Sequence, residues 1–356
     1  MKALRPKPRD TISLFGEIFV FREHGQAAWT VYCAEGRRAS VYLLEDDRGE
    51  FWALKVFKPM FRDPSLRDQE ELAVHTRALQ GLRSSHRRVV LPNASAARMF
   101  PELKYAILMP WIEGETWADI LLRPFAGITA PSLEDLIPTC YHLTRVLAQM
   151  EAVGIAHTDL SPGNLILDLS KREVQLIDLE DMYLATKPNP RFENLGVPGY
   201  RPLSVEHGES LWTRSADRYA GTILTAEMLL FSHPGFVSKF TQESLFTGPR
   251  GATENDKKFA EAAAALSGPF PRFAAVLSRA WTADTLDECP RLRAVSEAIA
   301  ADCPALQGVV ARSGVKPSRP AINKSRSPFR PNSRKLSLLV ALVIVLVAFY
   351  LVFIGH

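Results

Sequence analysis

The chain has 356 residues, of which 47% are hydrophobic and 23% are charged, and its formal net charge is +4. This is the composition of an ordinary globular protein of two or three folded units, and it excludes a wholly disordered or collagen-like chain. The small positive charge gives no reason to expect a nucleic-acid partner. No C-x-x-C spacing occurs among the cysteines, which indicates reduced thiols in a cytosolic domain rather than a disulfide framework or a zinc site. The cysteines are Cys33, Cys140, Cys289 and Cys303.

The first predicted elements are mainly strands. Residues 29–44 and 51–58 are rich in β-branched and aromatic side chains, which is typical of strands. Leucines recur at helical spacing over residues 64–82, so we expect a helix there. Residues 105–112 form an apolar run that predicts a further buried strand.

Helices dominate the rest of the pattern. Residues 132–153 predict a helix with Ser132 as its N-cap and acidic residues in its first turn. Two short apolar runs follow at 165–169 and 174–179, and from Asp217 onward the pattern is mostly helical. Strands with one helix first, and helices afterwards, predict an α+β chain in two lobes.

The strongest local motif is HTDLSPGN, residues 157–164. It places Asp159 and Asn164 five residues apart, and Asp178 follows Asn164 by fourteen residues at the end of the apolar run VQLID. A β-hairpin between them would bring two carboxylates and an amide to one spot. Phosphoryl transfer needs such a group, because one carboxylate orients the proton of the nucleophile while the other carboxylate and the amide hold Mg²⁺. Upstream, Lys55 lies in an apolar strand, where burial is unfavourable unless an anion such as a triphosphate pairs with it.

Together and in this order, these motifs resemble the protein kinase superfamily over about residues 28–300. HTDLSPGN matches the catalytic loop, WALK at 52–55 matches V-A-I-K, and DLE at 178–180 stands at the position of D-F-G. The segment GVPGYRP, residues 196–202, resembles the end of an activation segment, and residues 217–229 resemble the large-lobe helix that follows. The resemblance implies an α+β, two-lobed protein kinase-like fold with a small β-rich lobe and a larger helical lobe.

The resemblance also implies catalytic roles. Asp159 is the expected catalytic base, and Lys55 is expected to hold the α- and β-phosphates of ATP. Asn164 and Asp178 are the expected Mg²⁺ ligands. The cofactors implied are therefore ATP and Mg²⁺.

Supporting residues are implied as well. The acid that pairs with Lys55 should lie on the helix that follows, where Glu71 is the expected residue and Glu70 the alternative. His157 and Asp217 are expected to hold the catalytic loop in place rather than to react.

A nucleotide pocket follows from the same resemblance. Met109 is the expected gatekeeper. In the hinge Pro110-Trp111-Ile112, Pro110 would offer its carbonyl and Ile112 its N–H to the adenine. The other expected contacts are the apolar side chains on the two faces of the adenine and the middle glycine of the glycine-rich loop: Val41, Ala53, Ile166 and Gly36.

Several motif positions depart from the family pattern. In AEGRRASV, residues 34–41, only Gly36 remains of the glycine-rich loop, so we expect looser or reshaped nucleotide binding. Arg37 and Arg38 either compensate by their charge or form an exposed pair. Thr158 replaces the arginine that docks a phosphorylated activation segment, which predicts activity without that phosphorylation. Two further replacements, of a catalytic-loop lysine and of the D-F-G glycine, are Ser161 and Glu180.

The last part of the sequence has a different composition. Between Ser313 and Lys335 lie seven basic residues, several prolines and serines and no acid, which predicts a flexible linker. Its charges favour attraction to anionic lipid, with a solvated spacer as the alternative. Residues 336–354 carry no charge and would reach roughly 28 Å as a helix, so we expect a transmembrane helix, with a buried core helix as the alternative. The positive-inside rule then places the kinase-like part in the cytoplasm, in a tail-anchored arrangement.

These features divide the chain into five expected segments: an N-terminal lead at 1–27, a small lobe with hinge at 28–114, a large lobe at 115–308, the basic linker at 309–335 and the transmembrane helix at 336–354. The expected function is ATP- and Mg²⁺-dependent phosphoryl transfer to Ser or Thr hydroxyls of proteins at the cytoplasmic membrane face. Its expected partners are ATP, a protein substrate and membrane lipid.

Two alternatives remain open. The degraded glycine-rich loop favours a membrane-tethered pseudokinase that acts as a binding module. The strings DLSPGN and IDLE are similar to kinases of small molecules or lipid headgroups, of the aminoglycoside and choline kinase type. The segment GVPGYRP favours protein substrates over these, because small-molecule kinases usually lack it.

Overall fold

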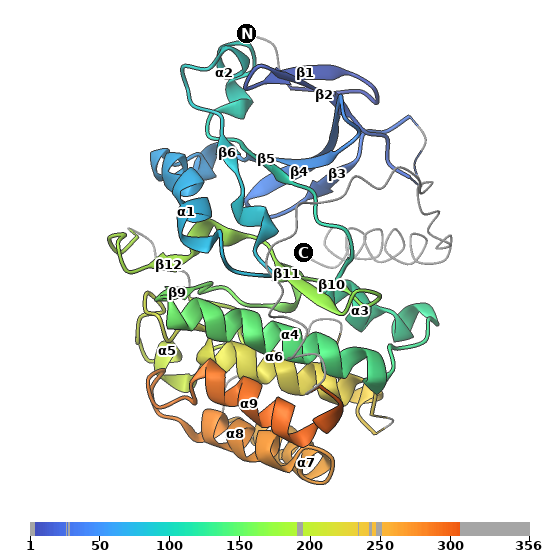
Figure 1. The fold of residues 1–356 in the computed structure, drawn as a ribbon, viewed down its shortest axis with the longest axis vertical. Coiled ribbons are helices and arrows are strands. Elements are labelled where there is room, and N and C mark those ends of the chain that lie inside the picture. Colours follow the sequence, from blue (N-terminus) through green and yellow to red (C-terminus); the bar gives the residue numbers. More distant parts are fainter. Residues whose placement is uncertain are drawn as a thin grey trace, which may run out of the picture.

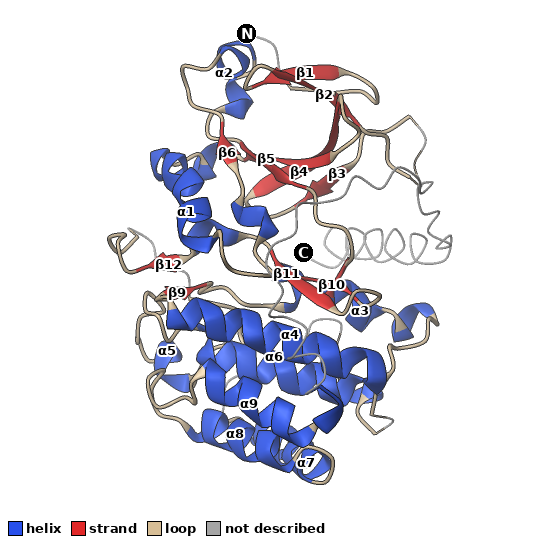
Figure 2. Ribbon diagram, in the orientation of Figure 1, coloured by secondary structure: helices blue, strands red, loops and turns tan. Residues whose placement is uncertain are grey.

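The computed structural model describes residues 4–25, 27, 29–190, 195–233, 235–241, 244–246 and 251–306. These residues form a small lobe made mostly of strands and a large lobe made mostly of helices (Figure 1 and Figure 2). The expected linker at 309–335 and the expected transmembrane helix at 336–354 lie outside the described residues. Within the described ranges, no helix has both the length and the hydropathy that crossing a bilayer requires.

The sheet of the small lobe has seven antiparallel strands: β1 (Thr11–Leu14), β2 (Glu17–Phe21), β3 (Cys33–Glu35), β4 (Ala39–Asp46), β5 (Phe51–Phe57), β6 (Arg88–Val89) and β7 (Ile107–Pro110). Their spatial order is β1-β2-β4-β5-β7-β6, with β3 paired to β4. Because side chains alternate along a strand, Ala53 and Lys55 of β5 share the face toward the cavity between the lobes. Leu54 and Val56 point the other way and pack with Phe19 in the core of the small lobe.

The helical segments of the small lobe are short. They are η1 (Pro59–Phe61), η2 (Pro64–Glu71), α1 (Leu72–Thr76), η3 (Arg83–Ser85), α2 (Ser95–Met99) and η4 (Pro101–Leu103). The expected continuous helix over 64–82 is therefore wrong: a 3₁₀ helix comes first, and the α-helix ends at Thr76. The buried residues Leu66, Gln69 and Leu72 recur every three positions, which is the period of a 3₁₀ helix.

The large lobe is built from helices: α3 (Trp117–Leu122), η5 (Pro124–Ala126), α4 (Leu133–Ala152), α5 (Leu203–Glu206), α6 (Asp217–Phe231), η8 (Val237–Lys239), α7 (Thr253–Ser267), α8 (Pro271–Thr282), α9 (Leu292–Asp302) and η9 (Pro304–Leu306). The expected helix with Ser132 as its N-cap is confirmed as α4, because the Ser132 hydroxyl accepts the Asp135 N–H at 3.2 Å. Every residue of α6 is buried, so this helix is the centre of the lobe, in contact with α4, α8 and α9.

Short strands and turns lie between the sheet and the large helices: β8 (Glu115–Thr116), β9 (Ile155–Ala156), η6 (Pro162–Asn164), β10 (Leu165–Asp168), β11 (Glu173–Leu176), η7 (Leu179–Asp181) and β12 (Tyr183–Leu184). The expected hairpin between Asn164 and Asp178 is confirmed as β10 and β11, which pair Leu165 with Leu176. The Ile177 N–H donates to the Asn164 carbonyl at 3.0 Å, so both ends of the hairpin meet beneath the small lobe.

Candidate functional site

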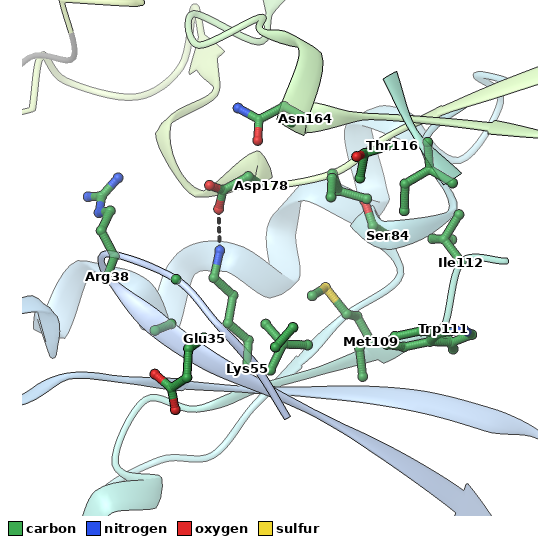
Figure 3. Close-up of a pocket in the computed structure, with 18 of the residues that line it drawn as sticks. Glu35, Arg38, Lys55, Ser84, Met109, Trp111, Ile112, Thr116, Asn164 and Asp178 are labelled. Carbon is green, nitrogen blue, oxygen red and sulfur yellow. Dashed lines mark hydrogen bonds and ion pairs between the residues drawn. The ribbon is translucent and has the colours of Figure 1, made fainter. Parts of the chain in front are cut away.

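A cavity of about 580 Å³ lies between the two lobes, and side chains from both lobes line it (Figure 3). It brings together the expected catalytic, metal-binding and nucleotide-binding residues with the exception of Glu71. Those that line it are Gly36, Val41, Ala53, Lys55, Met109, Pro110, Ile112, Asp159, Asn164, Ile166 and Asp178. Residues far apart in the sequence thus share one cavity, as the resemblance implied.

One end of the cavity is apolar. The pairing of β5 with β7 sets Ala53 opposite Met109, and Val41 of β4 lies opposite Lys55. Ile166 of β10 comes from the large lobe, so apolar side chains line the cavity from both lobes. The chain leaves β7 at Pro110 and continues along the cavity as the expected hinge. The apolar side chains at this end could pack against a flat ring.

The other end is charged. The Lys55 ammonium forms ion pairs with Asp178 and with Glu180, the latter at 2.6 Å between Nζ and Oε2. Burial alone would lower the pKa of Lys55, but the two carboxylates raise it above its ordinary value. Burial alone would raise the pKa of Asp178, but the Lys55 charge and hydrogen bonds hold it well below its usual range. Both partners are therefore charged at neutral pH.

Asp159 and Asn164 lie beside this pair. The Asn164 amide donates from Nδ2 to the Asp159 carbonyl at 2.7 Å, and its distance to the Asp159 carboxylate is 3.5 Å. Since the NH₂ group points to Asp159, Asn164 Oδ1 is left as an acceptor. Asn164 Oδ1 and the Asp178 carboxylate are hard oxygen donors on one cavity wall, and this set fits Mg²⁺, which takes few protein ligands and completes its shell with water and phosphate.

Buried hydrogen bonds hold the loop that carries Asp159 in place. The backbone N–H groups of His157 and Thr158 donate to the Asp217 carboxylate at 2.6 and 2.9 Å. The His157 ring is fully buried, and its Nε2 lies 2.8 Å from the Ile177 carbonyl. The expected supporting roles of His157 and Asp217 are confirmed by these contacts.

The expected ion pair between Lys55 and Glu71 is wrong. Glu71 is exposed, and Glu70 accepts the Val89 N–H at 2.7 Å. The three-residue period of η2 turns Gln69 and Leu72 inward, so the two glutamates between them face away from the cavity. The carboxylate that pairs with Lys55 in addition to Asp178 is Glu180.

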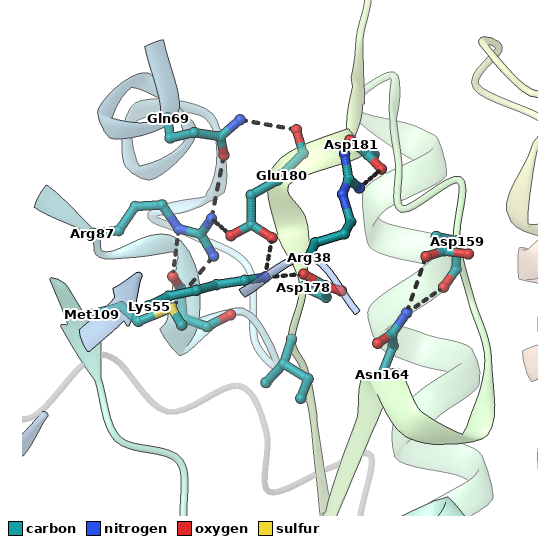
Figure 4. A network of polar contacts seen from close by, with 12 residues as sticks. Arg38, Lys55, Gln69, Arg87, Met109, Asp159, Asn164, Asp178, Glu180 and Asp181 are labelled. Atoms are coloured by element: carbon teal, nitrogen blue, oxygen red, sulfur yellow. Dashed lines mark hydrogen bonds and ion pairs between the residues drawn. The ribbon is translucent and has the colours of Figure 1, made fainter. Parts of the chain in front are cut away.

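Sequence reasoning missed Glu180 and its second partner, Arg87. The Arg87 side chain is fully buried, and its Nη1 lies 2.8 Å from Glu180 Oε1 (Figure 4). Gln69 Nε2 donates to the Glu180 carbonyl at 2.9 Å. The signal in the sequence was the glutamate at the glycine position of D-F-G, whereas nothing local marks Arg87.

The turn between β3 and β4, where the glycine-rich loop is degraded, also reaches the large lobe. Arg38 Nη1 forms an ion pair with Asp181 Oδ2 at 2.5 Å, and Nη2 lies 3.4 Å from Oδ1. Arg38 is therefore paired with the large lobe, whereas Arg37 is exposed. The sequence left two interpretations open for these arginines, compensation by charge or an exposed pair. Neither holds for both residues.

The segment expected to end the activation segment is anchored to α6. The Tyr200 hydroxyl donates to Glu227 Oε2 at 2.7 Å, and the Leu245 N–H donates to Glu227 Oε1 at 2.7 Å. Burial raises the pKa of Glu227 to about 7, although these hydrogen bonds lower it. The central helix thus fixes both the Tyr200 segment and the chain at Leu245.

No protein-family model matches the chain. The chain is 30% identical over 149 residues to the spindle assembly checkpoint serine/threonine-protein kinase BUB1 of Saccharomyces cerevisiae, covering 40% of this chain and 14% of the relative. It is 30% identical over 96 residues to protein kinase gsk3 of Schizosaccharomyces pombe, covering 27% of this chain and 24% of the relative. The chain therefore spans less than a quarter of the length of either relative.

The structure is similar to the crystal structure of the BubR1 kinase domain. The TM-score is 0.52 and the sequence identity 14%, with 88% of this chain and 87% of the other covered. The two-lobed protein kinase fold expected from the sequence is thereby confirmed. The chain contains a protein kinase-like domain whose sequence is locally similar to serine/threonine protein kinases.

Proposed function

We propose that this protein kinase-like chain is an ATP- and Mg²⁺-dependent phosphotransferase that acts on Ser or Thr hydroxyls of protein substrates. One observation carries the proposal: Lys55, Asp159, Asn164 and Asp178, from separate segments, line one cavity that is apolar at its other end. This is the arrangement that a nucleoside triphosphate requires, with the ring at the apolar end and the phosphates at the charged end.

Lys55 would leave Asp178 and bind the phosphates when nucleotide enters, because both anions compete for the same ammonium group. Asp178 and Asn164 would hold Mg²⁺, which supplies charge neutralisation of the phosphoryl group during transfer. The Asn164 amide, through its bond to the Asp159 carbonyl, keeps the catalytic loop at a fixed distance from the metal site.

Asp159 would accept the proton of the substrate hydroxyl. The hydroxyl oxygen forms a bond to the γ-phosphorus as the bond from that phosphorus to the β,γ-bridging oxygen breaks. ADP leaves with the electron pair of the broken bond, and the phosphorylated side chain is the product. Asp159 faces the same cavity as Lys55, so the nucleophile and the nucleotide would meet there.

Protein substrates are supported by the segment around Tyr200. Its hydroxyl is bonded to Glu227 of the central helix, which fixes this segment as part of a surface where a polypeptide could dock. Thr158 supports activity without phosphorylation of this segment, because it stands where the family has the arginine that binds a phosphate, and its hydroxyl instead donates to the Asp181 carbonyl at 2.8 Å.

The test is a transfer assay with labelled ATP and Mg²⁺ against three panels: Ser/Thr-containing proteins, aminoglycosides, and choline or lipid headgroups. We expect label on proteins, and treatment of the enzyme with phosphatase should leave this activity unchanged. Label on small molecules alone would favour the second alternative. Nucleotide binding without transfer to any panel would favour the pseudokinase.

We propose further that residues 336–354 anchor the chain in a membrane, with the kinase-like domain on the cytoplasmic side. The support is the uncharged apolar run that follows seven basic residues. The full chain should stay with phospholipid vesicles in high salt and at alkaline pH. Release of the chain by salt alone would contradict membrane insertion and would point to the basic linker as the sole contact.

A further inference from the structure

Four charged side chains form a neutral cluster at the inner end of the cavity: Lys55, Arg87, Asp178 and Glu180 (Figure 4). Asp178 remains 35% exposed, whereas the Glu180 side chain is only 4% exposed. The two carboxylates are therefore not equivalent. Asp178 faces the cavity and is available to a ligand, while Glu180 lies behind it.

Both oxygens of the Glu180 carboxylate are occupied by cations. Oε2 accepts from Lys55 at 2.6 Å, and Oε1 accepts from Arg87 at 2.8 Å. The Glu180 carbonyl accepts from Gln69 at 2.9 Å, which fixes the backbone as well. A carboxylate held on both oxygens and at its backbone has little freedom to leave Lys55.

The buried charge of Arg87 requires the Glu180 carboxylate to stay beside it. A guanidinium group keeps its charge at any ordinary pH, and this one is fully buried. Its other hydrogen bonds go to neutral groups: the Ser84 carbonyl, Gln69 Oε1 and Met109 Sδ. Among the residues that the structure describes, Glu180 is the carboxylate that compensates the Arg87 charge.

We propose that Glu180 is the permanent counter-ion of Lys55, that Arg87 and Gln69 position it, and that it replaces the helix carboxylate expected at Glu71. This inference rests on the proposed function, because Lys55 is the residue expected to bind ATP phosphates. Glu180 acts on the nucleotide through Lys55 and is a positioning residue.

The two carboxylates that pair with Lys55 come from the same part of the chain. Asp178 and Glu180 are two residues apart on one short segment that begins η7, and Asp178 takes a left-handed backbone conformation there, with φ of 62°. Both the proposed metal carboxylate and the permanent partner of Lys55 therefore depend on the position of this one segment, and neither depends on a carboxylate of α1.

The test compares Glu180→Gln with the matched control Glu71→Gln in the full-length chain. We expect Glu180→Gln to weaken Mg-ATP binding by at least about tenfold. It should also lower the melting temperature without nucleotide by roughly 5 °C or more, because it leaves Arg87 buried without a counter-ion. Glu71→Gln should change neither quantity. Loss of binding in Glu71→Gln, or unchanged binding in Glu180→Gln, would overturn the proposal.

A double variant separates positioning from simple stabilisation. Arg87→Met together with Glu180→Gln removes both buried charges, so the melting temperature should recover toward the wild-type value. The affinity for Mg-ATP should stay low, because Lys55 still lacks its partner. Recovery of affinity together with stability would show that Glu180 is structural only and would overturn the proposal.

The same experiment distinguishes this inference from the proposed function. Absence of any Mg-ATP binding by the wild type would contradict the proposed function. The melting temperatures need no nucleotide, and additive effects of Arg87→Met and Glu180→Gln would still contradict the pairing of these two residues.

Discussion

Two aspartates face the same cavity in different surroundings, and this difference separates their chemical roles. Asp178 is paired with Lys55, which keeps its carboxylate ionised and able to bind a cation. Asp159 has the Asn164 amide as its neighbour, and in the described part of the chain no cation forms an ion pair with its carboxylate. This difference supports the proposed roles of Asp159 as the base and Asp178 as a metal ligand.

Replacement of Asp159 by asparagine should abolish transfer but not binding. The amide cannot accept the proton, and we expect kcat to fall by about 10²- to 10⁴-fold. The affinity for ATP should change by less than about twofold, because Asp159 does not contact the nucleotide in the proposed mechanism. Turnover and calorimetric binding, measured on the same preparation, check this. An unchanged kcat would mean that the base lies elsewhere.

At this scale the sequence predicted most of the site. Asp159, Asn164 and Asp178 could be found because their spacing is set by one short loop and one hairpin. The partner of Lys55 could not be found in this way, because Glu180 reaches Lys55 through a contact between the two lobes, and Glu71 does not. The choice depends on which residues of η2 turn inward and on a buried cation, Arg87, that no local pattern predicts.

The elements that carry these residues are held by buried polar groups in α6. Asp217 at its start binds the catalytic loop, and Glu227 near its end binds the Tyr200 segment and Leu245. Since the helix is buried along its whole length, both attachments have a rigid base. The catalytic loop and the proposed docking surface therefore keep a fixed relation to each other.

Glu227 should make stability depend on pH. The folded state raises its pKa from the usual 4.5 to about 7, so between these values the folded state binds more protons than the unfolded state. The free energy of unfolding should therefore fall by roughly 3 kcal/mol as pH rises from about 4.5 to above 7. Melting temperatures of the wild type and Glu227→Gln, compared across this range, check it. Parallel curves for the two proteins would contradict the assignment.

The ion pair between Arg38 and Asp181 should slow nucleotide exchange. It joins the β3–β4 turn, which lines the cavity, to the segment after Asp178, and both side chains are about one third exposed. An exposed pair of this kind contributes about 0.5 to 1 kcal/mol, so Asp181→Asn should speed nucleotide release by roughly two- to fivefold. Stopped-flow release of a fluorescent ATP analogue measures this, with Asp47→Asn as the control. Equal rates in all three proteins would show that the pair does not close the cavity.

Element types were more predictable than element lengths. The hairpin β10–β11 and helix α4 follow the sequence patterns closely, because apolar runs and an N-cap mark them. The region 64–82 was predicted as one helix, since Leu66, Leu72 and Leu79 also fit a helical period. In the structure Gln69 is buried and donates to the Glu180 carbonyl of the large lobe. Its burial together with Leu66 and Leu72 fits the three-residue period of a 3₁₀ helix.

For the whole molecule, motif order was more informative than overall similarity. The fold matches a kinase domain at a sequence identity of 14%, a level at which few positions coincide. The motifs are found at the lobe interface, where side chains must converge on one ligand. The rest of the core needs only apolar side chains of suitable size, and many sequences can supply these.

The central claim is that one cavity binds ATP through a metal held by Asp178 and Asn164. Calorimetric titration of the wild type, Asp178→Asn and the control Asp168→Asn with ATP, with and without Mg²⁺, tests it most directly. We predict that Mg²⁺ strengthens ATP binding by the wild type and Asp168→Asn, and that Asp178→Asn loses this gain, at least about tenfold in affinity. Equal Mg-ATP affinity in the wild type and Asp178→Asn, or no binding by either, would contradict the account.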